Sequence, residues 1–217
     1  MRSSLLLMLL TFTACKTTDT HVHHAFDDAD AWAKRFEDPS RDAWQKPDEV
    51  IAALSLPKDA KVCDIGSATG YFPARVAKVV SEGHVYGADV ENSMVEYLNK
   101  RAATEGLGNL TSHLAEFADP KIPEPVDLVM MVNTYHHIEG RTAYFTNVAR
   151  SISPGGRLVI IDFTRASKMG PPAEAKVPRE GVEQELAAAG FTLIKAHDFL
   201  PEQFFLEFRA PPPKPTR

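Results

Sequence analysis

The chain has 217 residues, the size of one globular domain, and 44% of them are hydrophobic, which is enough to bury a core. Its formal net charge is -5, and the lysines and arginines are scattered instead of clustered. A nucleic-acid partner requires a basic surface that neutralises phosphates, so the composition argues against DNA or RNA and favours a small-molecule partner.

The first segment has the layout of a secretory signal. Arg2 precedes an apolar run from Leu5 to Phe12, which is too short to span a bilayer as a mature helix, and Thr13-Ala14-Cys15 follows. Residues 12–15 resemble a lipoprotein processing site, although such sites usually have Leu where Phe12 stands. We expect residues 1–15 to be a lipoprotein-like signal peptide and Cys15 to anchor the protein to a membrane of the cell envelope. If the apolar run is fortuitous and the signal is not used, a cytoplasmic location is expected instead.

Residues 16–28 are predicted to be a polar linker that contains His21, His23 and His24. These side chains can bind metal ions, but a segment without secondary structure does not fix ligand geometry, so no metal site is predicted. Cys63 is the only other cysteine, and no intrachain disulfide is expected in the mature protein. Residues 211–217 are proline-rich and should form an extended tail.

Residues 29–58 are predicted to be a helical cap. One helical pattern runs from Ala29 to Phe36 and ends at Asp38-Pro39; a second runs from Arg41 to Leu54, with Pro47 able to open another helical turn.

From residue 59 to residue 210, apolar runs alternate with amphipathic stretches, which is typical of a doubly wound α/β sheet. The runs 128–132 and 158–161 are apolar throughout, as parallel strands covered by helices on both faces must be. The short segment around Leu200-Pro201 cannot make a parallel crossover, so the last two of seven strands should form an antiparallel hairpin. The predicted strands are 61–65, 84–89, 110–114, 126–133, 157–163, 191–198 and 203–209, and the predicted helices are 71–80, 92–105, 141–152 and 179–189.

A glycine-bearing turn follows the first predicted strand, with Asp64 at the strand end and Gly66 and Gly70 behind it. Ligands of such sheets bind at the carboxyl ends of the strands, where a helix N-terminus offers free N–H groups. A dinucleotide fingerprint that began at Gly66 would need glycine where Ala68 and Tyr71 stand, so a nicotinamide cofactor is disfavoured.

Two carboxylates refine this interpretation. Asp64 would repel a pyrophosphate but suits a ligand that carries an ammonium and a sulfonium, which points to S-adenosylmethionine. Asp89 ends the second predicted strand, where a carboxylate can accept hydrogen bonds from both hydroxyls of a ribose. Asp89 can also be read as a helix cap.

Several motifs together resemble the class I S-adenosylmethionine-dependent methyltransferases, over about residues 61–209. The chain departs from that family at Ala68, where glycine is common, so a methyl group is expected beside the methionine part of the cofactor. The motifs are Asp64-x-Gly66-x-Ala68-x-Gly70, Asp89 with Ser93-Met94, the loop from Glu116 to Asp119, Val126-Asp-Leu-Val129, Tyr135-His-His137 and Pro154-Gly-Gly-Arg157.

The resemblance implies roles for individual residues in binding S-adenosylmethionine. Asp64 would meet the methionine ammonium, Gly66, Ala68 and Gly70 would line the methionine and ribose, and Asp89 would hold the ribose. Met94 and Phe117 would pack near the adenine, and either Glu116 or Asp119 would accept from its amino group. These two acids stand near prolines and are equally read as turn residues.

The segment from Asn133 to His137 ends the strand expected beside the first one, so it should face the transferable methyl group. Methyl transfer gains chiefly from alignment, and a base is needed only if the acceptor must lose a proton. His136 and His137 are the candidates for that base, and a histidine that merely fixes the loop is the alternative. Trp44, Tyr71 and Tyr135 either line an acceptor pocket or pack in the core.

The sequence therefore predicts S-adenosylmethionine-dependent methyl transfer to a small molecule, with the N-terminal helices and residues 166–178 closing over the acceptor. The alternatives are a non-catalytic S-adenosylmethionine-binding module and, from another class, a nicotinamide-dependent oxidoreductase. The predicted location conflicts with this function, because S-adenosylmethionine is made in the cytoplasm. Either the signal is inefficient, or the cofactor reaches the exported domain, or the domain is exported for another purpose.

Overall fold

The structure, a computed structural model, describes residues 28–212 and contains one seven-stranded sheet of order β3-β2-β1-β4-β5-β7-β6. All neighbouring strands are parallel except β7, which is antiparallel to both β5 and β6. The predicted α/β fold with a C-terminal hairpin is confirmed. The strands are β1 (Lys61–Ile65), β2 (His84–Asp89), β3 (Leu110–Leu114), β4 (Val126–Val132), β5 (Ile152–Phe163), β6 (Thr192–His197) and β7 (Gln203–Arg209).

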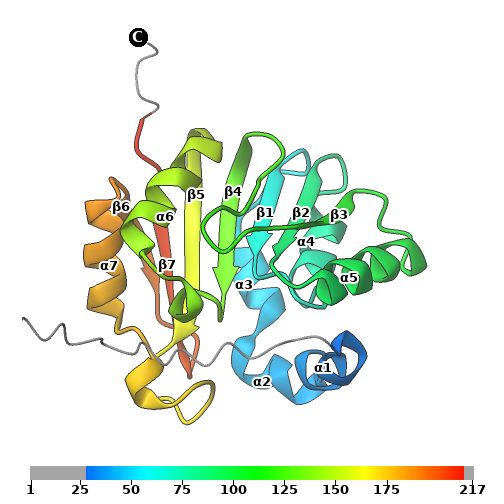
Figure 1. The fold of residues 1–217 in the computed structure, drawn as a ribbon, viewed down its shortest axis with the longest axis horizontal. Helices are drawn as coiled ribbons and strands as arrows, with labels where there is room; N and C mark the ends of the chain where they lie inside the picture. The colour runs from blue at the N-terminus through cyan, green and yellow to red at the C-terminus, as the bar shows by residue number, and fades with distance from the viewer. Residues whose placement is uncertain (1–27, 213–217) are drawn as a thin grey trace, which may run out of the picture.

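Helices cover both faces of the sheet (Figure 1). One core cluster joins β1 and β4 to α3 (Pro47–Leu54), α4 (Pro73–Val79) and α5 (Asn92–Thr104). The other joins the opposite sides of the same strands to α6 (Arg141–Val148) and α7 (Arg179–Ala188). This explains why the strands read as continuous apolar runs: Met130 faces the first cluster, its neighbour Met131 faces the second, and both are fully buried.

The cap lies where the parallel strands end. In Figure 1, α1 (Ala29–Phe36), α2 (Asp42–Gln45) and the segment after β5 all lie below the carboxyl ends of the strands. The short 3-10 turn η1 (Pro39–Arg41) joins α1 to α2. The cap thus covers the edge of the sheet at which the glycine turn and the carboxylates were predicted to form the site.

The second helical pattern of the cap is divided, because α2 ends at Gln45 and α3 begins at Pro47. Lys46, between them, adopts a left-handed conformation with φ 45°. The residue before a proline is disfavoured in the right-handed helical region, so the chain turns at Lys46 and Pro47 opens a new helix.

Most other element boundaries lie within two residues of the predicted ones, and two differ by more. The helix predicted over 141–152 ends at Val148, and a 3-10 turn, η3 (Ala149–Ser151), follows. Strand β5 begins at Ile152 instead of Arg157, because Val126 pairs with Ile152 before the register shifts to Leu128 and Arg157. The segment Pro154-Gly155-Gly156 belongs to this irregular start of the strand.

A buried ion cluster fixes the hairpin to the cap. Glu207 of β7 is 2% exposed and pairs with Arg157 of β5 and with His197 of β6. Arg157 also donates to the backbone oxygen of Leu54, the last residue of α3. The end of α3 is therefore held to the sheet by polar contacts as well as by its buried side chains.

Within residues 28–212, no helix is both long and apolar enough to cross a membrane. The same residues contain no group of three or more His, Cys, Asp or Glu side chains placed to hold a metal ion. Cys15 and the histidines at positions 21, 23 and 24 lie outside the described residues, so the predicted signal and linker stay predictions. Cys63 is a buried free thiol, and its burial raises its pKa.

Candidate active site

Unpartnered polar atoms mark the carboxyl edge of the sheet. In the part of the chain that the structure describes, four buried side-chain atoms lack a hydrogen-bond partner: Asp64 Oδ1, Ser67 Oγ, Gln203 Oε1 and Gln45 Nε2. Asp64 and Ser67 border the first turn, Gln203 begins β7, and Gln45 ends α2 of the cap. Buried polar groups are costly without partners, so this edge is built to receive a polar ligand.

The glycine turn connects β1 to α4 through left-handed backbone conformations. Gly66 and Gly70 have φ values of 76° and 92°, which glycine adopts at little cost. Neither position has room for a side chain: a Cβ on Gly66 would overlap the side chain of Thr134, and one on Gly70 would overlap Leu98. The glycines let the turn pack closely against β4 and α5.

Ala68 also adopts a left-handed conformation, with φ 44°. The family's glycine at this position therefore has a conformational explanation, which is additional to the predicted crowding of the cofactor. A left-handed conformation costs an alanine about 1–2 kcal/mol. Ala68 is partly exposed.

Asp89 links the turn to the start of α5. Its Oδ2 accepts from the backbone N–H of Ala68 at 2.8 Å, and its Oδ1 accepts from that of Glu91 at 3.0 Å. The helix-cap interpretation and the binding interpretation are thus compatible, since each carboxylate oxygen keeps a further lone pair. Burial raises the pKa of Asp89, and the hydrogen bonds from Glu91 and Ala68 oppose this.

Asp64 is a buried carboxyl group whose pKa is shifted by its surroundings. Its side chain is 4% exposed and its Oδ1 has no partner. Burial and the neighbouring charge of Asp89 hold the pKa of Asp64 well above its usual value, and the Arg41 guanidinium opposes them. A cation placed against Oδ1 would supply the missing partner and favour the charged carboxylate. The residues present therefore fit a ligand with an ammonium group.

The residues predicted near an adenine follow β2 and β3. Met94 of α5 is 1% exposed, whereas Phe117 is 68% exposed. Glu116 and Asp119 exchange backbone hydrogen bonds, and both carboxylates pair with Lys121, at 3.1 and 3.4 Å. The two acids thus share one cation, and the contacts do not decide which would bind an adenine amino group.

Past the end of β4, the structure distinguishes the two candidate histidines. His136 Nδ1 lies 3.0 Å from both oxygens of Asp162 in β5, and its side chain is 6% exposed. Asp162 also accepts from the backbone N–H groups of His136 and Phe163. His137 is exposed, and its ring lies 4.1 Å from that of His136. A ring that donates through Nδ1 presents its lone pair at Nε2.

Asn133 adjoins this pair in a left-handed conformation, with φ 57°. Its Oδ1 accepts from Gln203 Nε2, which joins the ends of β4 and β7. Gln203 pairs with Phe163 across the sheet, and the Phe163 ring lies 5.8 Å from that of Trp44 in the cap. A second group of polar and aromatic side chains thus lies beside the glycine turn.

The structure decides between the two interpretations of the aromatic residues at one position. Tyr135 packs in the core and does not line a pocket, whereas the lining role of Trp44 and Tyr71, which lie at the cap and the turn, stays a prediction. Tyr135 is fully buried in the second core cluster, stacks on Phe145, and donates to Glu185 of α7 at 2.7 Å. It is core because the 3-10 turn η2 (Tyr135–His137) directs successive side chains to different sides.

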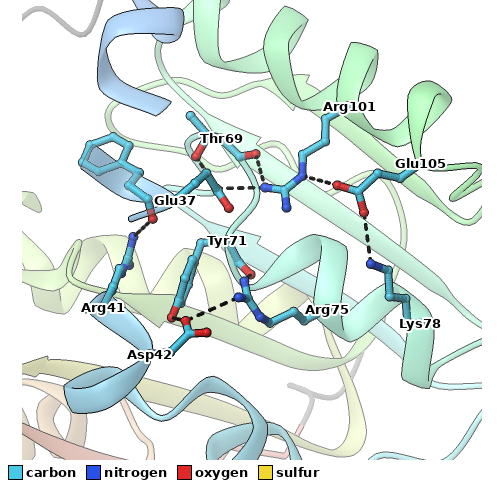
Figure 2. Close-up of polar contacts among 10 residues, drawn as sticks. Glu37, Arg41, Asp42, Thr69, Tyr71, Arg75, Lys78, Arg101 and Glu105 are labelled. Carbon is cyan, nitrogen blue, oxygen red and sulfur yellow. Dashed lines mark hydrogen bonds and ion pairs between the residues drawn. The ribbon is translucent and has the colours of Figure 1, made fainter. Parts of the chain in front are cut away.

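A polar network joins the cap to the glycine turn and α5 (Figure 2). Thr69 Oγ1 donates to Glu37 Oε1 at 2.7 Å, and Arg101 of α5 pairs with the same oxygen at 2.8 Å. Tyr71 donates its hydroxyl to Asp42, which also pairs with Arg75. Glu37 and Asp42 follow α1 and begin α2, so both connections arise from the cap segment that covers the site.

Several of these residues were not predicted from the sequence. Asp162 had a usable signal, since it ends an apolar strand as Asp64 and Asp89 do. Gln203 had none, because an antiparallel strand brings its first residue, not its last, to this edge. Glu37 and Arg41 are charged residues in a short polar connection, where sequence alone indicates only solvent exposure.

Comparisons with known proteins agree with this geometry. The family described as a methyltransferase domain matches residues 56–198. A malonyl-[acyl-carrier protein] O-methyltransferase of Methylococcus capsulatus is 29% identical over 64% of this chain and 54% of its own length. A ubiquinone/menaquinone biosynthesis C-methyltransferase UbiE of Vibrio vulnificus is 27% identical over 48% of this chain and 42% of its own.

Among solved structures, a SAM-dependent methyltransferase from Aquifex aeolicus is 27% identical and superposes with a TM-score of 0.77. The match covers 83% of this chain and 97% of that one. The chain belongs to the methyltransferase domain family, and the predicted family, fold and cofactor, S-adenosylmethionine, are confirmed at that level. It spans about half the length of the curated relatives that it matches.

Proposed function

We propose that the protein transfers a methyl group from S-adenosylmethionine to a small-molecule acceptor. The observation that carries this proposal is Asp64, a buried carboxylate at the end of β1 with one oxygen unpartnered, beside Asp89 at the end of β2. When bound, S-adenosylmethionine supplies an electrophilic methyl group on a sulfonium. The family match and the relatives that are methyltransferases support the same assignment.

In this proposal the chain's own residues divide between two subsites. Asp64 receives the ammonium, Asp89 receives the ribose hydroxyls, and the turn from Gly66 through Ala68 to Gly70 lies along the methionine and ribose. Met94, Phe117 and one of the acids Glu116 and Asp119 surround the adenine. Asn133, at the end of β4, separates this subsite from the one beside His136.

The acceptor subsite contains a base held in one orientation. Asp162 accepts from His136 Nδ1, so the imidazole keeps a lone pair on Nε2 and can take a proton from an acceptor hydroxyl, amine or activated carbon. Asp162 does not touch the acceptor; it positions His136. Gln203 Oε1 and Gln45 Nε2, both buried and unpartnered, are an acceptor and a donor for polar groups of the substrate.

The substrate class is inferred from the base beside the end of β4. The names of the matched relatives show methyl transfer to oxygen in one case and to carbon in the other. Because Asp162 orients His136 as a base, we propose a small acceptor that loses a proton during transfer and is enclosed by Trp44, Phe163 and the segment 166–178. Lys176 of that segment is buried and donates to Ser167 O at 2.6 Å, which holds the segment closed on itself.

The test begins with mass spectrometry of the ligand that copurifies, followed by release of S-adenosylhomocysteine over an acceptor panel. Variants His136→Asn and Asp162→Asn should lower kcat by about 10²–10⁴-fold and leave S-adenosylhomocysteine affinity unchanged. His137→Asn is the comparison variant on the neighbouring ring, because Asp162 orients the ring of His136. Tight cofactor binding without turnover on any acceptor would support the non-catalytic binding module instead.

We also propose that the protein is a lipoprotein anchored through Cys15. The support is the sequence alone: an apolar run that stops just before Cys15 and a polar linker at residues 16–28 that can hold the domain away from a membrane. Cys15→Ser should leave the protein uncleaved or in the soluble fraction. Intact Met1 on the native protein, detected by mass spectrometry, would contradict the proposal.

A further inference from the structure

Arg41 is a cap residue whose guanidinium lies at the glycine turn. It lies 4.0 Å from the centre of the ring of Tyr71, the residue after Gly70. Arg41 Nη1 donates to the backbone oxygen of Phe36 at 2.7 Å, and Nε donates to Gln45 Oε1. Within residues 28–212, Nη2 makes no hydrogen bond or ion pair. Both N–H groups of Nη2 are therefore available to a ligand.

Arg41 and Asp64 influence one another electrostatically but do not meet. Burial lowers the pKa of Arg41 to about 10, and the charge of Asp64 counteracts that effect. No ion pair joins the two in the described part of the chain, and Asp64 Oδ1 has no partner at all. Arg41 and Asp64 thus lie at the same turn without pairing with each other. Each is available to the opposite charge of a zwitterionic ligand, the cation to its anionic group and the anion to its cationic group.

We propose that Arg41 binds the carboxylate of the amino-acid part of S-adenosylmethionine while Asp64 binds its ammonium. This inference rests on the proposed function. An α-amino acid carries its two charges on neighbouring atoms, so a cation on one side and an anion on the other select it over an uncharged chain. The Nη2 donors of Arg41 suit a carboxylate because the planar guanidinium matches its geometry.

The surroundings hold Arg41 ready for this contact. Figure 2 shows the Tyr71 ring between the side chains of Arg41 and Arg75, whose guanidinium carbon lies 4.1 Å from the ring centre. Stacking and two hydrogen bonds fix the plane of Arg41, so little conformational entropy is lost on binding. Arg75 differs, because it is engaged by Asp42 and by the backbone oxygen of Tyr71. It provides a matched control on the same ring.

The experiment measures affinities by calorimetry for three ligands on the full chain. S-adenosylhomocysteine has both charges of the amino acid, its decarboxylated analogue has only the ammonium, and 5′-methylthioadenosine has neither. Arg41→Met keeps an unbranched, flexible side chain and removes the charge, and Arg41→Lys keeps the charge without the planar group. Arg75→Ala is the control.

Arg41→Met should weaken S-adenosylhomocysteine about tenfold or more and leave the other two ligands within about twofold of the wild type. The affinity of Arg41→Lys for S-adenosylhomocysteine should lie between those of the wild type and Arg41→Met. Arg75→Ala should keep the wild-type ratios of affinity among the three ligands. Equal losses for all three ligands would show that Arg41 only positions the cap, and would overturn the inference. If the wild type binds none of the three, the proposed function fails and the role of Arg41 fails with it.

Discussion

Thr69, inside the glycine turn, donates its hydroxyl hydrogen to Glu37, the residue that ends the first cap helix, at 2.7 Å. The same carboxylate pairs with Arg101 of α5 at 2.8 Å. One side chain of the cap therefore touches both the turn that would line the cofactor and the helix behind it. We therefore expect this connection to control the access of a ligand to the buried Asp64.

The first prediction concerns that connection. Glu37→Ala removes both contacts, so the cap should open more often and S-adenosylhomocysteine should dissociate about tenfold faster, since hydrogen bonds to charged groups contribute roughly 1.5–3 kcal/mol. Stopped-flow displacement measures the rate, and hydrogen exchange of α1 reports opening. Glu49→Ala is the control, because Glu49 is exposed on α3 and contacts only Lys46. An unchanged dissociation rate would show that the cap does not control access.

The second prediction concerns Asp64. Its pKa is raised in the folded protein, so the charged carboxylate costs stability near neutral pH, and that cost disappears as the pH falls through the raised value. Asp64→Asn should therefore raise the Tm of the ligand-free protein near pH 7 while weakening S-adenosylhomocysteine at least about tenfold. The exposed Asp59→Asn should change neither quantity.

The pH dependence of binding follows from the same group. An ammonium pairs with the charged form of Asp64, so the affinity of the wild type should fall as the pH is lowered through the raised pKa. Calorimetry in that pH range, in buffers of different ionisation enthalpy, should detect a released proton in the wild type and not in Asp64→Asn. Identical pH profiles for the two proteins would remove Asp64 from the binding site.

The third prediction concerns Ala68. Its φ of 44° favours glycine, so Ala68→Gly should stabilise the protein by about 0.5–1 kcal/mol once the extra freedom of glycine in the unfolded chain is subtracted. Cofactor affinity should stay the same or increase. The same substitution at Ala103, exposed within α5, should destabilise by about 1 kcal/mol. Denaturant unfolding measures the free energy of unfolding of both variants. An equal loss of stability in the two would mean that the backbone of Ala68 is not strained.

The fourth prediction concerns Asp89. Asp89→Ala removes the acceptor for the Ala68 and Glu91 N–H groups as well as the proposed ribose contacts, so S-adenosylhomocysteine should bind at least about tenfold more weakly. 5′-Methylthioadenosine should weaken by the same factor, because it retains the ribose. Arg41→Met, in contrast, should weaken S-adenosylhomocysteine and leave 5′-methylthioadenosine nearly unchanged. Calorimetry with both ligands distinguishes the two variants, and retained affinity of Asp89→Ala for both ligands would refute the ribose assignment.

The sequence was sufficient to predict those strands and helices that can be recognised from the pattern of their own residues. The strands from Lys61 to Ile65 and from Gln203 to Arg209 have the predicted bounds because buried runs end at polar or turn residues on both sides. The start of β5 was not predictable, because Ile152 pairs with Val126 across an irregular Pro-Gly-Gly segment that is not strand-like by itself.

The candidate site divides in the same way. Asp64 and Asp89 were predictable because the carboxyl ends of adjacent parallel strands share one edge. Arg41 and Gln203 reach that edge through a cap helix and an antiparallel strand, so their roles depend on tertiary contacts that no local pattern encodes. The pairing of His136 with Asp162 needs the register of β4 against β5, which also only the fold supplies.

The bend at Lys46 divides the cap mechanically. Beyond it, Val50 and Leu54 of α3 are fully buried in the core, and Arg157 holds the end of that helix. Before it, Glu37 and Asp42 join the segment of α1 and α2 to the turn by polar contacts of their side chains. We expect the N-terminal helices and the sheet to be two units of unequal local stability, joined at Lys46 and Pro47. If the first unit opens while the second stays intact, ligand exchange costs only the local free energy of α1 and α2 and not that of global unfolding.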